Sequence, residues 1–479
     1  MIRSIIFSVV LVSFLLPRML FSQDVFLRSQ ADVNAFDPAT IVINGNLLIG
    51  DDTYPYNSDI TNLSNLSNIT SISGDLVIQF NAALSNLDAL LNLSTIWGGL
   101  NIQYNKALTS MDGLSNLTTI SGGLYIYNNV ALTNLDGLSN LTTISGSLGI
   151  YYNDSLSNVD GLLNLTIISG GLYISQNKAL TNLDGLSNLT TISGSLGIYY
   201  NSLTNLEGLS NLTFISGSLA IEGNHGLTNL EGLSNLTTIS GSLVIERNDG
   251  LTNLEGLSNL TTISGDLRIN NNYTLTNLEG LSNLTTISGN LRIYNNNNLS
   301  NVDGLSNLTT ISGNFYIYFN YALTNMDGLS NLTTISGNLI IDINIALTNV
   351  DGLSNLTTIS GYLYISRNSA LTNLDGLSNL TTILGNLDIV DNDALTNCCG
   401  IQKLLVTPGA IGGQITIYDN PSECSSEQEI VESSCGIKLA VQTFPPCINV
   451  DNGTLQITVT GYDTIPFFPD FRSKNQYNF

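Results

Sequence analysis

Tyrosines and a few charged residues recur at fixed places along this 479-residue chain, and their chemistry is that of contact rather than of catalysis. Tyrosine offers flat, amphipathic area at a low cost in conformational entropy, which suits a sugar ring or a protein partner. Tyrosine pairs across strands also stabilise a sheet without any ligand, so a purely structural role stays open. The candidate ligand-binding residues are Tyr125, Tyr127, Tyr151, Tyr173, Tyr199, Arg268, Arg292, Tyr294, Tyr316, Tyr318 and Tyr364.

A second recurring feature is one carboxylate per repeat, and a solvated corner is the expected place for it. Asp before Gly is a common turn former, whereas a strong calcium site needs several oxygens that converge on one ion. Calcium therefore stays the alternative, and no metal ligand is assigned. The column consists of Asp88, Asp112, Asp136, Asp160, Asp184, Glu207, Glu231, Glu255, Glu279, Asp303, Asp327, Asp351 and Asp375.

Catalytic machinery is not expected in this chain. It has one histidine, His225, and no nucleophile motif, phosphate-binding loop or cluster of metal ligands. Between Ile72 and Ile383 no repeat is longer than 24 residues, so no inserted loop could build a cleft there. We predict a protein without enzymatic activity, catalytic residues or cofactors.

The secondary structure that positions the tyrosines and the carboxylates can be predicted from the repeat. The isoleucine of each "ISG" or its variant, used here as a marker, lies at residues 72, 96, 120, 144, 168, 192, 215, 239, 263, 287, 311, 335, 359 and 383. Every step is 24 residues except one of 23, and degenerate units flank the array at Ile43 and Ile411. A fixed period of this length is typical of a solenoid.

One repeat cannot bury its own leucines, but stacked repeats can. In "LYIY", Leu124 and Ile126 alternate with tyrosines, which is the periodicity of a strand. If Leu124 and Ile126 face the core, the residues five and seven after the marker face solvent. Glycine and asparagine interrupt every longer apolar stretch, so we expect very short strands joined by corners. The fold class predicted is all-β, a right-handed parallel β-helix of about 16 coils.

Two positions do not vary among the fourteen regular repeats, and both indicate stacking. The glycine two after the marker, from Gly74 to Gly385, suggests a positive φ or a close approach between backbones. The asparagine nine after the marker, from Asn81 to Asn392 and again at Asn420, predicts a ladder of amides that bond to each other and to corner backbone groups.

Charge and the N-terminus limit the partners and the compartment. The formal net charge of −24, with 13 basic residues, argues against nucleic acid or an anionic membrane as a partner. Residues 1–23 combine Arg3, an apolar run and a small residue near the end, as in a secretory signal peptide. We expect an exported protein with no membrane insertion after cleavage, an uncleaved signal anchor being the alternative.

All five cysteines lie near the C-terminus, at positions 398, 399, 424, 435 and 447. Export permits disulfides there, but the sequence leaves open how Cys398 and Cys399 pair with Cys424 and Cys435, and Cys447 is left over. We divide the chain into a signal peptide (1–23), an N-terminal cap with the first degenerate coil (24–60), regular repeats (61–397), a C-terminal cap with the last coil (398–447) and an incomplete β-like tail (448–479). Within the C-terminal cap, a short helix is expected over 421–435.

The repeat resembles the receptor L-domain type of leucine-rich repeat, and more closely bacterial surface proteins that string such repeats together. The resemblance covers about residues 31–435 and rests on "L-x-I-x-x-N-x-x-L" joined to "GLSNLTTISG". The segment "NCCGIQKLL…GGQITIYDNPSEC" is similar to the closing cap of those bacterial proteins. The resemblance implies exposure outside the cell and binding rather than catalysis, without specifying a ligand.

These observations predict a secreted or cell-surface protein that presents a Tyr-rich face to a carbohydrate or protein ligand. The alternative is a structural spacer at the surface with no specific ligand.

Overall fold

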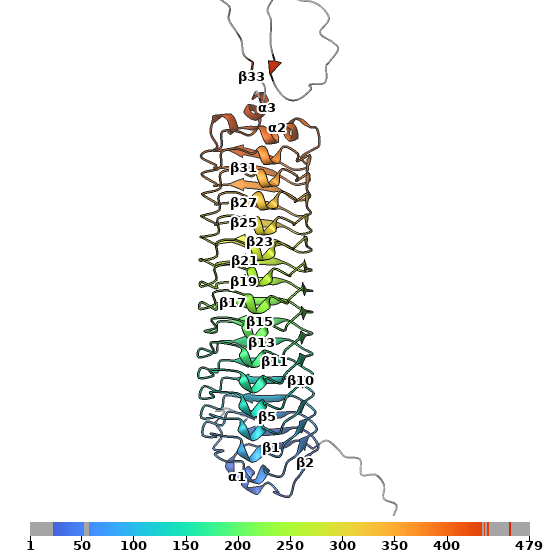
Figure 1. Ribbon diagram of the computed structural model, residues 1–479, viewed down its shortest axis with the longest axis vertical. Coiled ribbons are helices and arrows are strands. Elements are labelled where there is room, and N and C mark those ends of the chain that lie inside the picture. The colour runs from blue at the N-terminus through green and yellow to red at the C-terminus, as the bar shows by residue number, and fades with distance from the viewer. Residues whose placement is uncertain (1–22, 52–56, 434, 436–437, 440–458, 461–479) are drawn as a thin grey trace, which may run out of the picture.

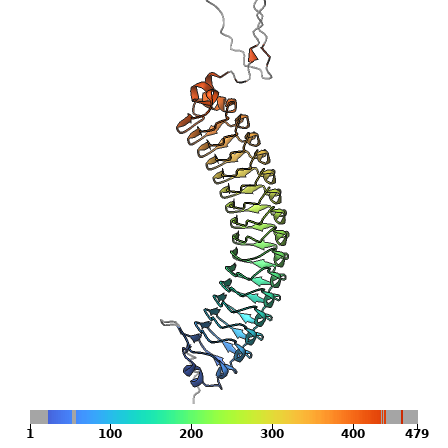
Figure 2. The same ribbon diagram turned by 90° about the vertical axis from the view of Figure 1, so that its left-hand side faces the viewer.

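The computed structural model describes residues 23–51, 57–433, 435, 438–439 and 459–460. The chain winds through a stack of short coils that bends into an arc (Figures 1 and 2). Parallel strands dominate and helices are few, which confirms the predicted leucine-rich-repeat solenoid. The predicted signal peptide up to residue 22, Cys447 and all but two residues of the predicted tail lie outside the described residues.

A 17-stranded sheet runs the length of the stack, and it is called the long sheet below. Each strand pairs in parallel with the strand of the next coil, in register and 24 residues apart in the regular array, or 23 apart between the strands that begin at Leu196 and Leu219. Its strands are β1 (Val25–Leu27), β3 (Leu47–Gly50), β5 (Leu76–Gln79), β7 (Leu100–Gln103), β9 (Leu124–Tyr127), β11 (Leu148–Tyr151), β13 (Leu172–Ser175), β15 (Leu196–Tyr199), β17 (Leu219–Glu222), β19 (Leu243–Glu246), β21 (Leu267–Asn270), β23 (Leu291–Tyr294), β25 (Phe315–Tyr318), β27 (Leu339–Asp342), β29 (Leu363–Ser366), β31 (Leu387–Val390) and β32 (Ile415–Tyr418).

A second sheet, of 15 two-residue strands, contains the marker isoleucines. Its strands are β2 (Val42–Ile43), β4 (Ser71–Ile72), β6 (Thr95–Ile96), β8 (Thr119–Ile120), β10 (Thr143–Ile144), β12 (Ile167–Ile168), β14 (Thr191–Ile192), β16 (Phe214–Ile215), β18 (Thr238–Ile239), β20 (Thr262–Ile263), β22 (Thr286–Ile287), β24 (Thr310–Ile311), β26 (Thr334–Ile335), β28 (Thr358–Ile359) and β30 (Thr382–Ile383).

The third side of each coil is a one-turn 3₁₀ helix, which explains why leucines recur three residues apart. The N–H of Leu138 donates to Leu135 O at 2.8 Å, and that of Leu141 donates to Leu138 O at 3.0 Å. A period of three residues per turn places these leucines on one buried side. The helices are η1 (Ser64–Leu66), η2 (Asp88–Leu90), η3 (Asp112–Leu114), η4 (Asp136–Leu138), η5 (Asp160–Leu162), η6 (Asp184–Leu186), η7 (Glu207–Leu209), η8 (Glu231–Leu233), η9 (Glu255–Leu257), η10 (Glu279–Leu281), η11 (Asp303–Leu305), η12 (Asp327–Leu329), η13 (Asp351–Leu353) and η14 (Asp375–Leu377).

The glycine of "ISG" is required because neighbouring coils approach closely. A Cβ on Gly146 would lie 2.5 Å from the nitrogen of Gly123 in the preceding coil. Of the two reasons expected for this glycine, close approach applies, and positive φ belongs to a different position. The residue eight after the marker has a φ of 52–61° in nearly every coil, even where it is Ile343 or Phe319. This left-handed corner directly precedes the buried asparagine.

The predicted asparagine ladder is present and buried. Asn248 has no exposed surface, and its Nδ2 donates to Ile221 O at 2.9 Å while its backbone N–H donates to Asn272 Oδ1 at 3.1 Å. Its own Oδ1 accepts the N–H of Asn224 at 3.1 Å. The same backbone-to-amide bonds link successive coils from Asn81 to Asn420. Each asparagine side chain therefore satisfies two backbone groups of the preceding coil, and its own backbone N–H is satisfied by the asparagine of the next coil.

Helices lie at both ends of the stack (Figure 1). Helix α1 (Gln30–Ala35) begins with a capping box formed by Ser29 and Asp32. At the other end, α2 (Cys399–Val406) replaces a 3₁₀ turn, and the helix expected over 421–435 is a turn, η15 (Ser422–Cys424), followed by α3 (Glu427–Glu432).

Disulfides join Cys398 to Cys424 and Cys399 to Cys435. Within the described ranges, no helix is long and apolar enough to cross a membrane. The short strands β33 (Lys438–Leu439) and β34 (Val459–Thr460) pair antiparallel.

We predict that Asn248→Ala destabilises the fold far more than a similar change at the surface. The substitution leaves the buried N–H of Asn224 without its acceptor, at a cost of about 1–3 kcal/mol, and removes the side-chain donor from the carbonyl of Ile221. Asn259 is the matched control, because its exposed amide makes a single bond to Ser234 O at 2.7 Å. Asn259→Ala should cost less than about 1.5 kcal/mol. Urea unfolding followed by circular dichroism measures both, and equal losses would contradict the role of the ladder.

Candidate binding surface

The outward side of the long sheet carries all eleven predicted site residues. In β23, Leu291 and Ile293 are fully buried, while Arg292 and Tyr294 are half-buried on the opposite side. The same alternation holds in β9, β13 and β25, whereas β21 and β29 end in a buried residue, Asn270 and Ser366. In β11 and β15 a buried glycine takes the place of the first outward side chain. Tyr125, at 40% exposure, is more open than the other ten.

These residues do not form one cluster. Tyr127 and Tyr151 belong to one aromatic group and Tyr294 and Tyr318 to another, whereas the other five predicted tyrosines lie outside both groups. In the first group (Phe80, Tyr104, Tyr127, Tyr151, Tyr152), the rings of Phe80 and Tyr104 stack with centroids 4.8 Å apart, and Tyr104 meets Tyr127 edge to face at 5.0 Å. In the second group (Tyr294, Tyr318, Phe319, Tyr321), Tyr294 and Tyr318 stack at 4.8 Å with planes 4° apart. Contact between rings in successive coils gives each group a continuous aromatic surface.

Several ring-bearing residues of these groups were missed by the strand periodicity. Tyr104, Tyr152 and Phe319 occupy the left-handed corner directly after the strand, where alternation of faces no longer applies. Their rings nevertheless contact outward tyrosines of the sheet, as Tyr152 contacts Tyr127 at 5.5 Å. The recurrence of aromatic residues eight positions after the marker isoleucine in several repeats could have identified them.

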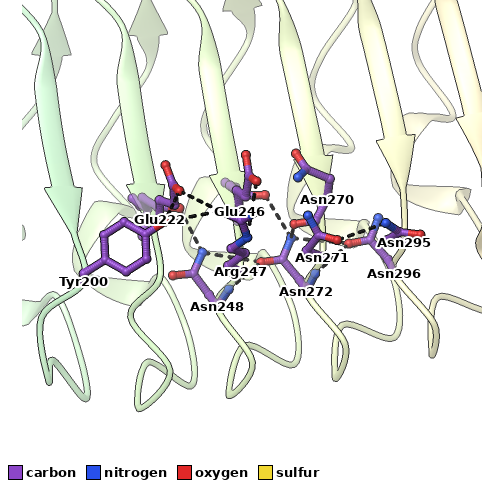
Figure 3. Close-up of polar contacts among 12 residues, drawn as sticks. Tyr200, Glu222, Glu246, Arg247, Asn248, Asn270, Asn271, Asn272, Asn295 and Asn296 are labelled. Carbon is purple, nitrogen blue, oxygen red and sulfur yellow. Dashed lines mark hydrogen bonds and ion pairs between the residues drawn. The ribbon is translucent and has the colours of Figure 1, made fainter.

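A charged patch, formed by Tyr200, Glu222, Glu246 and Arg247, is shown in Figure 3. Its coils, with strands β15, β17 and β19, come between those of the two aromatic groups along the stack. The hydroxyl of Tyr200 donates to Glu222 Oε1 at 2.5 Å, and Arg247 Nη1 lies 3.4 Å from the same oxygen. The hydrogen bond to the Glu222 carboxylate raises the pKa of Tyr200. Arg247 also lies 3.7 Å from Glu246, so the acidic side chains of β17 and β19 share one guanidinium.

The two predicted arginines differ in how far the sheet engages them. Arg292 Nη1 lies 2.6 Å from Asp266 Oδ2, and its guanidinium sits over the ring of Tyr316 at 5.6 Å. Burial raises the pKa of Asp266, but bonds from Asn290 and Arg292 outweigh burial and leave that pKa below its usual value. Arg268 Nε and both amide atoms of Asn270 are buried without a hydrogen-bond partner. Arg292 is thus held by the fold, while Arg268 keeps a donor unused.

The carboxylate residues of the acidic column lie at the corners where the 3₁₀ helices begin. Each carboxylate residue of the repeats opens a 3₁₀ helix, and the side chain two residues earlier caps its backbone N–H, as Asn253 does for Glu255 at 3.1 Å. Burial, followed by the charges of Asp375 and Asp327, raises the pKa of Asp351. Within the described part of the chain, no group of three His, Cys, Asp or Glu residues is placed to hold a metal ion.

Neutral phenols make the surface amphipathic at physiological pH. Burial, with smaller contributions from neighbouring tyrosines, raises the pKa of Tyr151 to about 12. Burial is also the main cause that raises the pKa of Tyr199, Tyr294 and Tyr318. These hydroxyls therefore remain hydrogen-bond donors, and the surface suits contact with a ligand rather than acid–base chemistry.

We predict that the free energy of unfolding falls as the pH rises above about 10, the pKa of an unperturbed tyrosine. The pKa of Tyr151 is higher in the folded than in the unfolded chain. The stability that Tyr151 contributes is therefore complete below about pH 10 and is lost as the pH rises through about 12. Urea unfolding at pH 9, 10, 11 and 12 measures this slope, and tyrosinate absorbance reports ionisation. Tyr151→Phe should make the slope shallower. A stability independent of pH across this range would refute the prediction.

Two solved structures are similar to this chain at low sequence identity. An internalin (inlF) from Listeria monocytogenes shares 20% identity over 69% of this chain and 88% of that chain, with a TM-score of 0.39. TLR13, in a complex with ssRNA13, shares 15% identity over 82% of this chain and 70% of that chain, with a TM-score of 0.25. No curated protein matches the chain.

A sequence model of a protein family matches most of this chain. The model described as Receptor L domain matches residues 94–185, 164–227, 213–279, 261–332 and 331–435. These overlapping matches cover most of the chain and follow the repeated coils one after another. The chain belongs to the Receptor L domain family.

Proposed function

We propose that this chain is a secreted or cell-surface protein for binding and adhesion, without enzymatic activity, and that the outward side of the long sheet holds a glycan or protein ligand. Membership in the Receptor L domain family supports a ligand-binding repeat protein. The observation that carries the proposal is the pair of aromatic groups, whose rings contact each other from coil to coil on an outward surface. Tyrosine and arginine are enriched where proteins bind partners.

The proposed binding residues are the eleven outward residues of the sheet, together with the corner residues Tyr104, Tyr152 and Phe319. Tyr316 and Tyr318 lie side by side in β25, next to the Arg292 guanidinium and the ring of Tyr294. This group combines apolar area with phenolic and guanidinium donors. A net charge of −24 supports a neutral or basic ligand rather than a nucleic acid.

The proposal extends to the finer architecture and the compartment. We propose a right-handed coil of about sixteen turns, with caps at residues 24–60 and 398–447, following a signal peptide over 1–23. The Cys398–Cys424 and Cys399–Cys435 disulfides support an extracellular location, because such bonds persist in oxidising compartments.

A structural spacer is the second candidate function, and one observation favours it. Ten of the eleven predicted residues are half-buried against neighbouring side chains of the sheet. Tyrosine pairs such as Tyr294 with Tyr318 stabilise a sheet even when nothing binds to it.

Binding measurements on the mature chain separate these functions. Residues 24–479 should bind members of a glycan array or a defined surface protein. The double variant Tyr316→Ser, Tyr318→Ser should bind about tenfold more weakly or worse, because it loses both rings from one contact surface. Tyr273→Ser is the matched control, since this tyrosine is 46% exposed and lies in a loop outside both aromatic groups. Absence of any binding by the unaltered chain, or equal binding by the double variant, would favour the spacer.

A further inference from the structure

A hollow of about 330 Å³ opens beside the first aromatic group. Its floor consists of glycines from two successive coils, Gly98–Gly99 and Gly122–Gly123, and its walls include Asp75, Asn101 and Tyr125. Sites for small ligands occupy about 300–1,000 Å³, so this hollow has room for one ring-sized group.

The hollow exists because a ladder of side chains is interrupted there. The residue three after the marker usually carries an oxygen that accepts the backbone N–H of the equivalent residue in the next coil. Ser218 Oγ accepts the N–H of Ser242 at 3.0 Å, and Asn314 Oδ1 accepts that of Asn338 at 2.8 Å. Asp75 Oδ1 likewise accepts the N–H of Gly99 at 2.6 Å. Gly99 and Gly123 then occupy this position in two successive coils and have no side chain with which to continue.

The interruption leaves backbone donors unused. Within the described part of the chain, neither Gly123 nor Ser147 has an acceptor for its backbone N–H. A Cβ on Gly99 would lie 3.6 Å from the nitrogen of Gly123, so the Gly123 N–H borders the space that a side chain fills elsewhere. A ligand oxygen in that space would replace the missing rung of the ladder.

The walls supply an acceptor and a stacking surface. Asn101 lies in register between Val77 and Tyr125 on the outward side of the sheet. Its Oδ1 is buried without a hydrogen-bond partner, so the lining of the hollow includes an acceptor that the protein leaves unused. Tyr125 is 40% exposed and offers an aromatic face beside these polar groups.

We propose that this hollow binds one ring of a neutral saccharide. A sugar hydroxyl both donates and accepts, so one ring can accept from the Gly123 N–H and donate to Asn101. The C–H face of the same ring packs on Tyr125. The carboxylate of Asp75 and the net charge of −24 disfavour an acidic sugar. The site rests on the proposed function, because it uses Tyr125 of the outward surface and a glycan ligand, but it requires neither the second aromatic group nor the charged patch.

Gly99→Ser combined with Gly123→Ser tests the site with the side chain that the array itself uses. Serine occupies this position in successive coils at Ser195, Ser218 and Ser242, so the backbone accepts it. A Cβ on Gly123 would lie 2.7 Å from Cε2 of Tyr125, so the double variant fills the hollow and also displaces the Tyr125 ring. Gly171→Ser is the matched control, because Gly171 is an isolated glycine of the same column. Asn101→Ala should weaken binding about fivefold through the loss of one hydrogen bond.

Isothermal titration calorimetry with glucose, galactose, mannose, N-acetylglucosamine and their neutral disaccharides measures affinity. Trp97, the only tryptophan of the chain, is 63% exposed and directly precedes Gly98, so its fluorescence gives a second readout. We expect saturable binding of at least one neutral sugar by the unaltered chain and by Gly171→Ser, and a loss of at least about tenfold in the double serine variant.

Three results would overturn the proposal. One is the absence of saturable binding by every neutral sugar in the panel. Another is binding that the double serine variant retains, which would place the sugar elsewhere. The third is equal or tighter binding of galacturonic acid. Tyr316→Ser with Tyr318→Ser should leave sugar binding in the hollow unchanged, so failure of this site and failure of the proposed function are distinguishable.

Discussion

The buried asparagine ladder is the interaction on which the rest of the structure depends. Each rung, such as Asn248, bonds to the coil after it through its backbone N–H and to an earlier coil through its side chain. A slip by one residue would turn the outward side chains into the core and break every rung at once. The left-handed corner before each asparagine, present even at Ile343, is a local cost that these bonds offset.

A fixed register explains why one half of each repeat is constant and the other varies. The glycines admit the neighbouring backbone, the leucines fill the core and the asparagines join the coils, so their types are constrained. Outward residues of the long sheet contact other surface residues of the same and adjacent coils and do not enter the core, so their types can change without altering the fold. The stacked rings of Tyr294 and Tyr318, the patch around Arg247 and the glycine floor beside Asn101 are three outcomes of that freedom.

Features that recur with the 24-residue repeat could be predicted from the sequence, whereas features that depend on contacts between coils were missed. Strand alternation at Leu124 and Ile126 and the ladder from Asn81 onward follow from the period and from polar satisfaction. The corner conformation of Tyr104 could not be read in this way, because tyrosine has no preference for positive φ. The disulfide partners of Cys398 and Cys399 depend on how α2 and α3 pack, which spacing leaves open. The engagement of Arg292 by Asp266 depends likewise on a neighbouring coil.

In-register stacking of successive coils is the central claim, and cross-linking across the long sheet tests it most directly. Ala220 and Val244 are register partners on the outward side of β17 and β19, so their Cα atoms should lie about 4.8 Å apart, within reach of a disulfide. Oxidation of an Ala220→Cys, Val244→Cys variant should give an intrachain disulfide, detected by mass spectrometry of its peptides. Ala220→Cys with Arg268→Cys, two coils apart at roughly 10 Å, should not. A cross-link in the second variant but not in the first would contradict the register and the surface built on it.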